Sequence, residues 1–214
     1  MPRILLYISI SIFMCQCTTS RITGTWKGTD IHPEHYKNIL VLAIIHGPDS
    51  SLREIMEKHM VNQLTAHGCR AVSACSYYGQ GAFVSLPADS IKKILQRDSI
   101  NVVLTIDLRD KSREIYDVTE KVLFSLYPFR ENDFWMYYAA MNEYHPFYGD
   151  YKEHTAWFWK SNIYDVTSGA LVYAVQTASF DPLSREDLSS GYARIIVKNI
   201  IRNNILQPHK YPGN

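Results

Sequence analysis

The stretch "NILVLAII", residues 38–45, sets the interpretation of the chain around it. After its first residue the run is apolar throughout, which is typical of a strand covered on both faces. Residues 51–67 follow with a capping box at Ser51 and Glu54 and an apolar stripe at helical spacing. Gly68 comes directly after them, at the position where a helix end favours glycine. The pattern predicts a buried strand followed by a helix.

The alternation of strands and helices continues beyond this first pair. Residues 69–78, "CRAVSACSYY", are interpreted as a second strand, residues 88–97 as a short helix and residues 100–108, "INVVLTIDL", as a third strand. Right-handed crossover connections would make these three strands parallel. Charged residues alternate along residues 107–113, which we interpret as a solvated edge strand whose charges prevent unwanted pairing.

The second half of the chain predicts two strands in direct succession. Residues 155–166 and 170–179 flank the turn "TSG", whose glycine suits a positive φ. A second capping box begins at Ser184 and opens a helix that continues to about residue 204. The expected fold class is α/β: β-α-β-α-β, a long aromatic insert at residues 119–154, a β-hairpin and a C-terminal helix, in one mixed sheet with helices packed on it.

Composition is that of an ordinary globular protein. The chain has 214 residues, of which 46% are hydrophobic, enough for one sizeable core and a single domain. It contains 22 Lys and Arg against 21 Asp and Glu, a formal net charge of +1. A nearly neutral chain lacks the basic footprint of a nucleic-acid-binding protein, so no nucleic-acid partner is expected.

The first 16 residues are interpreted as a secretory signal peptide. Arg3 precedes a short apolar run from Ile4 to Met14, which is too short to span a bilayer. The run ends at Cys15 and Cys17, and this ending resembles a bacterial lipoprotein signal, in which a cysteine becomes the first mature residue and carries acyl chains. Cys17 is the predicted lipidation site because a polar run starts directly after it, and Cys15 is the alternative. A plain cleaved signal with incidental cysteines is the other interpretation.

The lipoprotein interpretation predicts how the mature chain is organised. Residues 17–35 would form a lipidated tether in which Trp26 docks on the domain, residues 36–206 a single α/β domain, and residues 207–214 a tail. Several acyl chains, palmitate among them, would hold the protein firmly at a membrane. The expected location is the cell envelope, anchored in the outer membrane and facing the periplasm or the cell surface.

Aromatic residues are concentrated in one part of the chain. Residues 124–159 hold 14 of the 27 aromatics, a density that argues against disorder. Tyr and Trp combine flat apolar faces with a polar group, which suits protein interfaces and stacking on sugars. The residues expected to bind a partner are Trp135, Tyr137, Tyr148, Trp157 and Trp159. In the other interpretation the segment folds back and caps the sheet as a second small core.

Candidate catalytic and metal-binding residues have simpler structural explanations. His32 and His35 lie in one polar segment, but two histidines without further ligands do not make a metal site. Paired carboxylates could hydrolyse glycosides, and the candidates are Asp107, Asp110, Asp165 and Asp181. Because the first two fall in the predicted edge strand and the others beside turns, the sequence predicts no enzyme, no metal and no cofactor.

The remaining two cysteines, Cys69 and Cys75, fall in the predicted second strand. Six residues of strand extend about 20 Å, whereas a disulfide requires Cα atoms within about 7 Å. If that strand is continuous, the two thiols cannot pair. We expect two small buried residues.

Several segments, in this order, resemble a family of small bacterial lipoproteins with a domain of unknown function: "CTTSRITGTWK", "YKNILVLAI", "REIMEKHMVNQLTAHGCRAVSA", "INVVLTIDL" and "SNIYDVTSGALVYAVQTASFDP". The resemblance covers most of residues 17–205. It implies an architecture similar to the N-terminal domain of the Tol-system translocation protein and to the periplasmic domain of the curli secretion channel. It supplies no catalytic residues.

Together these features predict a non-enzymatic envelope lipoprotein that binds another cell-envelope component through its aromatic-rich insert and hairpin. The expected partners are the lipid bilayer, through the acyl anchor, and an envelope protein or further copies of the chain. Two alternatives stay open. One is a cell-wall saccharide-binding or hydrolytic module, and the other is a subunit of an oligomeric envelope or secretion assembly.

Overall fold

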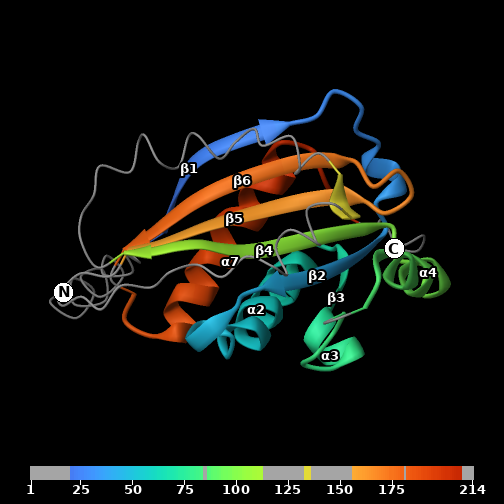
Figure 1. The fold of residues 1–214 in the computed structure, drawn as a ribbon. Helices are drawn as coiled ribbons and strands as arrows, with labels where there is room; N and C mark the ends of the chain where they lie inside the picture. The colour runs from blue at the N-terminus through green and yellow to red at the C-terminus, as the bar shows by residue number, and fades with distance from the viewer. Residues whose placement is uncertain (1–19, 84–85, 113–132, 136–155, 181, 209–214) are drawn as a thin grey trace, which may run out of the picture.

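The fold is an α/β arrangement of one mixed six-stranded sheet with helices packed on both of its faces (Figure 1). The computed structural model describes residues 20–83, 86–112, 133–135, 156–180 and 182–208. This confirms the fold class expected from the sequence, including the hairpin and the C-terminal helix.

The sheet has the strand order β1-β6-β5-β4-β2-β3. Strand β2 pairs in parallel with β3 and β4, as the crossover rule predicted, whereas β4, β5, β6 and β1 pair antiparallel in turn. The strands are β1 (Ser20–Lys27), β2 (Asn38–Ile44), β3 (Arg70–Ser73), β4 (Val102–Ser112), β5 (Ala156–Asp165) and β6 (Leu171–Phe180).

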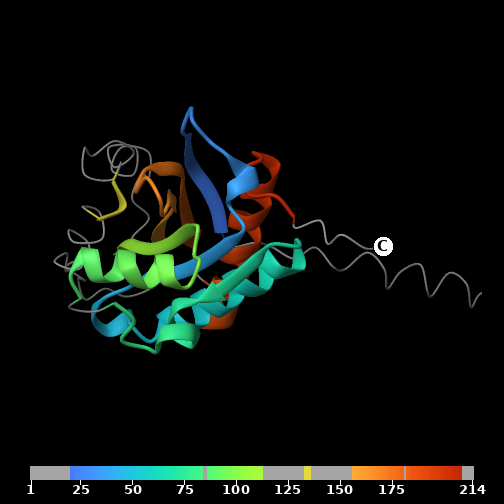
Figure 2. The ribbon, with the colours of Figure 1, turned by 90° about the vertical axis from the view of Figure 1, so that its right-hand side faces the viewer.

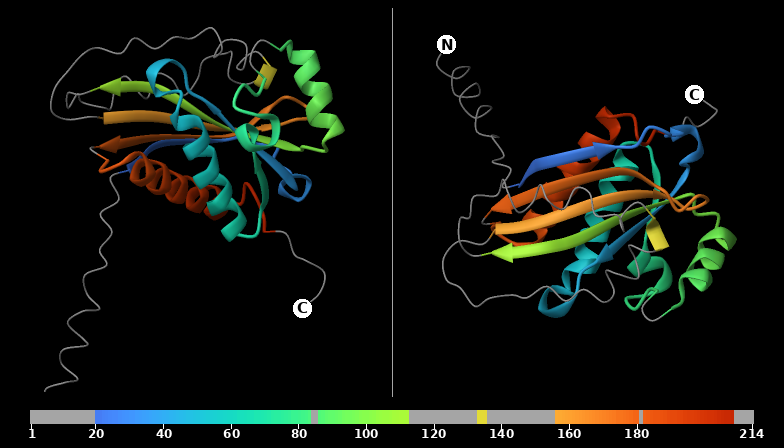
Figure 3. Two further views of the ribbon diagram at one scale, coloured as in Figure 1. Left: turned by 90° about the horizontal axis from the view of Figure 1, so that it is seen from below. Right: turned by 45° about the horizontal axis from the view of Figure 1, so that its top comes forward.

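Four α-helices and two short 3-10 turns complete the described structure. Helices α2 and α7 pack on one face of the sheet, while α3 and α4 pack against the opposite face (Figure 3). The helices are α2 (Leu52–Ala66), α3 (Ala74–Tyr78), α4 (Ala88–Arg97) and α7 (Arg185–Arg202), and the 3-10 turns are η1 (Pro33–His35) and η2 (Gly47–Asp49). In the described ranges, no helix is long and apolar enough to cross a membrane.

The two predicted capping boxes behave differently. At the start of α7 the Ser184 hydroxyl accepts a hydrogen bond from the Asp187 amide at 3.0 Å, as the pattern predicts. At the start of α2 the Ser51 side chain makes no cap, and its Oγ instead accepts a hydrogen bond from Arg185 of α7 at 2.6 Å. A contact between two helices therefore replaces the local cap.

A buried carboxylate connects α2 to the ends of two parallel strands. Glu57 lies on α2 and is fully buried. Its Oε1 accepts a hydrogen bond from the Ala43 amide at 2.8 Å, and its Oε2 accepts from the Ser73 hydroxyl at 2.6 Å and the Cys75 amide at 2.7 Å. These three bonds join β2, the end of β3 and the start of α3, so Glu57 fixes how the first helix packs against the sheet.

The second strand, predicted over residues 69–78, is confirmed only in its first half. Only Arg70–Ser73 is strand, and the residues that follow form α3 because Ser73 caps that helix by accepting a hydrogen bond from the Ser76 amide at 3.1 Å. Cys69 and Cys75 are buried free thiols, as expected. The continuous strand on which that expectation was based does not form, because α3 begins at Ala74. Burial raises the pKa of the Cys75 thiol to about 12.

The polar lead-in proposed for residues 17–35 is wrong for residues 20–27, which belong to the sheet. Residues 20–27 form β1, which pairs with β6 along its whole length, so the sheet begins before the predicted domain start at Tyr36. Only the docking of Trp26, which packs against a core cluster, was foreseen. The strand escaped prediction because its residues are mostly polar and its one described neighbour, β6, lies far along the chain.

The interpretation of residues 107–113 as a solvated edge is wrong at Asp107, where β4 is an internal strand paired with β2 on one side and β5 on the other. From Leu108 to Ser112 the structure shows pairing with β5 alone. Asp107 is buried, and Lys111 makes an ion pair with Asp49 at 3.1 Å while lying over the Trp157 ring at 4.1 Å. Asp107 and Lys111 therefore make contacts within the fold, whereas Asp110 is exposed.

Candidate functional site

A groove opens at the end of the sheet where the β5–β6 turn meets the connection from β1 to β2, the end that Figure 2 faces. Its volume is about 660 Å³, within the usual range for binding sites. Its walls combine one half-buried indole with carboxylate, imidazole, amide and hydroxyl groups. The polar and aromatic lining residues include Trp26, Asp30, His32, His35, Asn101, Asp165 and Ser168.

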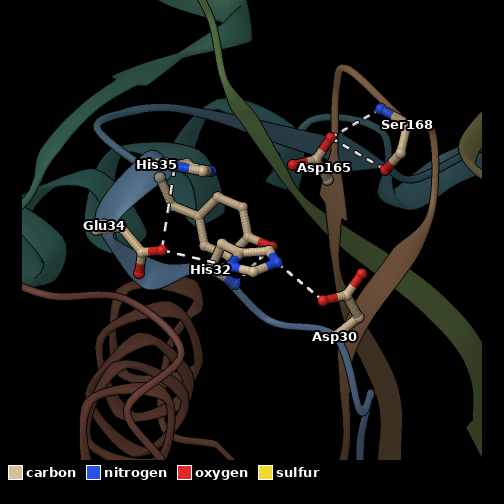
Figure 4. A network of polar contacts seen from close by, with 7 residues as sticks. Asp30, His32, Glu34, His35, Asp165 and Ser168 are labelled. Carbon is tan, nitrogen blue, oxygen red and sulfur yellow. Dashed lines mark hydrogen bonds and ion pairs between the residues drawn. The ribbon is translucent and has the colours of Figure 1, made fainter.

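The wall formed by the β1–β2 connection is held by a network of imidazole and carboxylate side chains (Figure 4). The His32 ring lies between two carboxylates, with Nε2 at 2.8 Å from Asp30 and Nδ1 at 3.3 Å from Glu34. The His35 ring stacks on that of His32, with 5.4 Å between centroids. A backbone hydrogen bond, with His32 adding to it, lowers the pKa of the Glu34 carboxyl, so Glu34 stays ionised in this network.

The opposite wall is the tight turn between β5 and β6. Asp165 Oδ1 accepts hydrogen bonds from the Ser168 amide at 2.8 Å and from the Ser168 hydroxyl at 3.0 Å, and Gly169 adopts a φ of +76°. The local turn role predicted for Asp165 is therefore confirmed. The same bonds orient its carboxylate at the groove, where Figure 4 shows the second oxygen on the side away from Ser168.

The described part of the aromatic insert is attached to this same turn. Asp133 forms an isolated antiparallel β-bridge with Ala170, and the Phe134 amide donates a hydrogen bond to the Gly169 carbonyl at 2.7 Å. The Phe134 ring is buried against Tyr164, while Trp135 stays half-buried beside Gly169. The insert and the hairpin thus meet at the groove end of the sheet.

Two of the predicted binding residues are not available to a partner. Trp157 and Trp159 are buried in the core beneath α7, with their rings stacked at 5.8 Å. They point inward because odd-numbered residues of β5 face α2 and α7, so their predicted binding role is corrected to a packing role. Trp135 is half-buried, and Tyr137, Tyr148, Cys15 and Cys17 lie outside the described residues.

The carboxylates considered for hydrolysis are not brought together. Asp107 lies opposite Lys160, whereas Asp165 lies opposite Val102, five residues away along β4. That separation is about 16 Å of strand, beyond the spacing that a pair of glycosidase carboxylates needs. Asp110 is exposed on β4, and Asp181 lies outside the described residues.

A row of buried polar residues crosses the three central antiparallel strands, and the sequence patterns did not reveal it. Asp107, Lys160 and Gln176 are direct cross-strand neighbours on β4, β5 and β6, and all three are buried. Asp107 Oδ2 contacts the Arg109 guanidinium at 2.9 Å. Burial lowers the pKa of Lys160 to about 7, with the Arg109 charge adding to the effect and Asp107 opposing it. Polar residues inside otherwise apolar strand segments were the only signal in the sequence.

Within the described ranges, no group of three or more His, Cys, Asp or Glu side chains has the arrangement to hold a metal ion. His32 and His35 face carboxylates and each other rather than a common centre. The histidine pair is therefore part of the groove wall and not the basis of a metal site among the described residues.

No protein-family model and no curated protein matches the chain. Among solved structures, it is similar to the PelC dodecamer from Paraburkholderia phytofirmans, at 11% identity and a TM-score of 0.45, covering 89% of this chain and 99% of that one. It is also similar to lipoprotein GNA1162 from Neisseria meningitidis, at 13% identity and a TM-score of 0.40, covering 77% and 98%. A PDZ domain protein from Parabacteroides distasonis follows at 13% identity and 0.41, covering 91% and 37%. Likenesses this low carry no argument about function.

Proposed function

We propose that this protein is a non-enzymatic, lipid-anchored component of the bacterial cell envelope that binds another envelope component at the groove end of its sheet. The observation that supports this is the convergence of three features at the β5–β6 turn. These are the groove, the imidazole–carboxylate network of the β1–β2 connection, and the attached Phe134–Trp135 segment of the insert. Concave sites lined by an aromatic ring and a few fixed polar groups are typical binding sites.

A binding role fits the groove better than a catalytic role does. The groove carboxylates have defined partners, since Asp165 is bonded to Ser168 and Asp30 contacts His32. The two described thiols, Cys69 and Cys75, do not line this groove, and burial raises the pKa of both, which disfavours the reactive thiolate. The described groove residues thus include fixed acceptors but no activated cysteine.

The anchor is tested by replacing the predicted lipidated cysteine. Cys17→Ser is expected to move the full-length protein from the membrane fraction to the soluble fraction, because one or more acyl chains would be lost. Cys15→Ser is the matched control and is expected to leave the protein at the membrane. Fractionation followed by immunoblotting measures both. Release by Cys15→Ser alone would assign the acyl group to Cys15, and release by neither would contradict the anchor.

The contact surface is tested by site-specific photo-crosslinking in cells. A photo-reactive residue at Thr167, which is exposed and lines the groove, is expected to give a discrete protein adduct. The same residue at Leu183, which is 93% exposed outside the groove, is the control and is expected to give none. Equal adducts at both positions, or an adduct at neither, would contradict the groove as the contact. A saccharide adduct at Thr167 would favour the saccharide-binding alternative.

A further inference from the structure

We propose that the groove receives a positively charged side chain, arginine or lysine, from a partner protein. This inference deepens the proposed function and rests on it. The supporting observations are the charge balance of the groove, the fixed orientation of one carboxylate, and the way this protein already binds a cation between a carboxylate and an indole at the other end of its sheet.

Carboxylates dominate the charge of the groove. Asp30 and Asp165 line it, and Glu34 contacts His32 in the adjoining network. Among the described lining residues Lys27 is the sole lysine or arginine, and its ammonium group donates to the Asn203 carbonyl at the end of α7, at 2.8 Å. The same three carboxylates act on the Tyr36 phenol. Burial raises the pKa of Tyr36, and the negative charges of the carboxylates raise it further. A cation entering the groove would therefore meet a negative potential.

Asp165 is the carboxylate best placed to bind a cation. Its Oδ1 accepts both hydrogen bonds from Ser168, which fix the side chain without neutralising its charge. Within the described structure Oδ2 has no hydrogen-bond partner. Asp30 is 89% exposed and contacts His32, so it contributes a second, more mobile charge. A fixed acceptor with an adaptable neighbour suits a guanidinium or an ammonium group.

The protein itself provides a template for this type of contact. At the opposite end of the sheet, the Lys111 ammonium lies 3.1 Å from Asp49 and 4.1 Å from the centre of the Trp157 ring. The groove presents the same two kinds of group, carboxylates and the indole of Trp26. A cation between an acid and an indole gains both ion pairing and cation–π attraction. The groove thus offers the components of that contact to a cation supplied from outside.

The open shape of the groove favours a side chain carried on a protein surface. The groove lies beside the half-buried Trp135 and the exposed turn residues, so a partner could pack around the inserted cation. Buried arginines surrounded by less critical contacts are typical centres of protein interfaces. A partner protein accordingly suits this surface better than a free cation does.

The test measures the binding of two peptides to the full-length protein in detergent by titration calorimetry. One peptide is acetyl-Gly-Arg-Gly-Arg-Gly-amide, and the other carries citrulline, a neutral isostere, in place of both arginines. We expect the arginine peptide to bind at least tenfold more tightly than the citrulline peptide, and its affinity to fall as salt is raised. Equal affinities for the two peptides would overturn the inference.

Matched variants locate the binding. Asp165→Asn and Asp30→Asn, combined in one variant, are expected to weaken binding of the arginine peptide at least tenfold. Both changes remove a negative charge, and asparagine at position 165 keeps an acceptor for Ser168. Asp89→Asn, an exposed change on α4, is the control and is expected to have no effect. Loss in the control, or no loss in the groove variants, would place the contact elsewhere. If crosslinking at Thr167 captures a partner while the two peptides bind alike, the proposed function stands and this inference fails.

Discussion

Replacing Glu57 by alanine is expected to lower the free energy of unfolding by about 4 kcal/mol, because three buried donors would lose their acceptor at once. The amides of Ala43 and Cys75 and the hydroxyl of Ser73 would remain buried without a replacement. The cavity left by the side chain adds to the cost. For a chain of this length the change corresponds to a fall in melting temperature of about 10 °C, measurable by circular dichroism.

Glu54 provides the matched control for this prediction. It lies one turn earlier on the same helix, is exposed, and accepts a hydrogen bond from Gln80 at 3.1 Å. Glu54→Ala removes the same side chain and charge, and is expected to change stability by less than about 0.5 kcal/mol. If both variants lost similar stability, the effect would belong to helix propensity or net charge, and the bridging role of Glu57 would be wrong.

Replacing Lys160 by methionine is expected to remove a pH dependence of stability between pH 7 and pH 9. The pKa of Lys160 is about 7 in the folded protein, against about 10.4 for an exposed lysine. In that window the unfolded chain binds a proton that the folded protein does not, so stability rises with pH by up to about 1.4 kcal/mol per pH unit. The gain is lost as pH falls through 7. Denaturant unfolding at several pH values measures the slope.

The comparison between variants isolates the contribution of Lys160. The buried thiols Cys69 and Cys75 give an opposite slope above about pH 8.5, because burial raises their pKa values, but they are present in every variant. Lys198→Met, an exposed change of the same charge on α7, is expected to keep the wild-type slope. If Lys160→Met kept it too, Lys160 would not be the titrating group.

The groove could be predicted only in part. The turn residues around Asp165 and the pair His32 and His35 were recognised as local features. Their meeting depends on β1 pairing with β6, a contact between segments about 150 residues apart in the sequence. Because no local pattern encodes such a contact, sequence reasoning placed His32 and His35 in a tether and found no site.

The aromatic residues show the same limit. Alternation along β5 indicated that Trp157 and Trp159 share one face, which the structure confirms. It could not indicate whether that face points to a partner or to the core. The helices α2 and α7 cover that face, and both rings lie in the core cluster beneath them.

By itself the sequence determined the order of the principal strands and helices, the parallel start of the sheet and the tight hairpin. These follow from hydrophobic periodicity, turn glycines and the cap at Ser184, which act within a few residues of one another. Only the tertiary structure decided that residues 20–27 form a strand, that β4 is internal, and that Glu57 and Lys160 are buried. Each of these depends on hydrogen bonds and burial supplied by distant segments, and a local pattern carries no information about which distant segment will supply them.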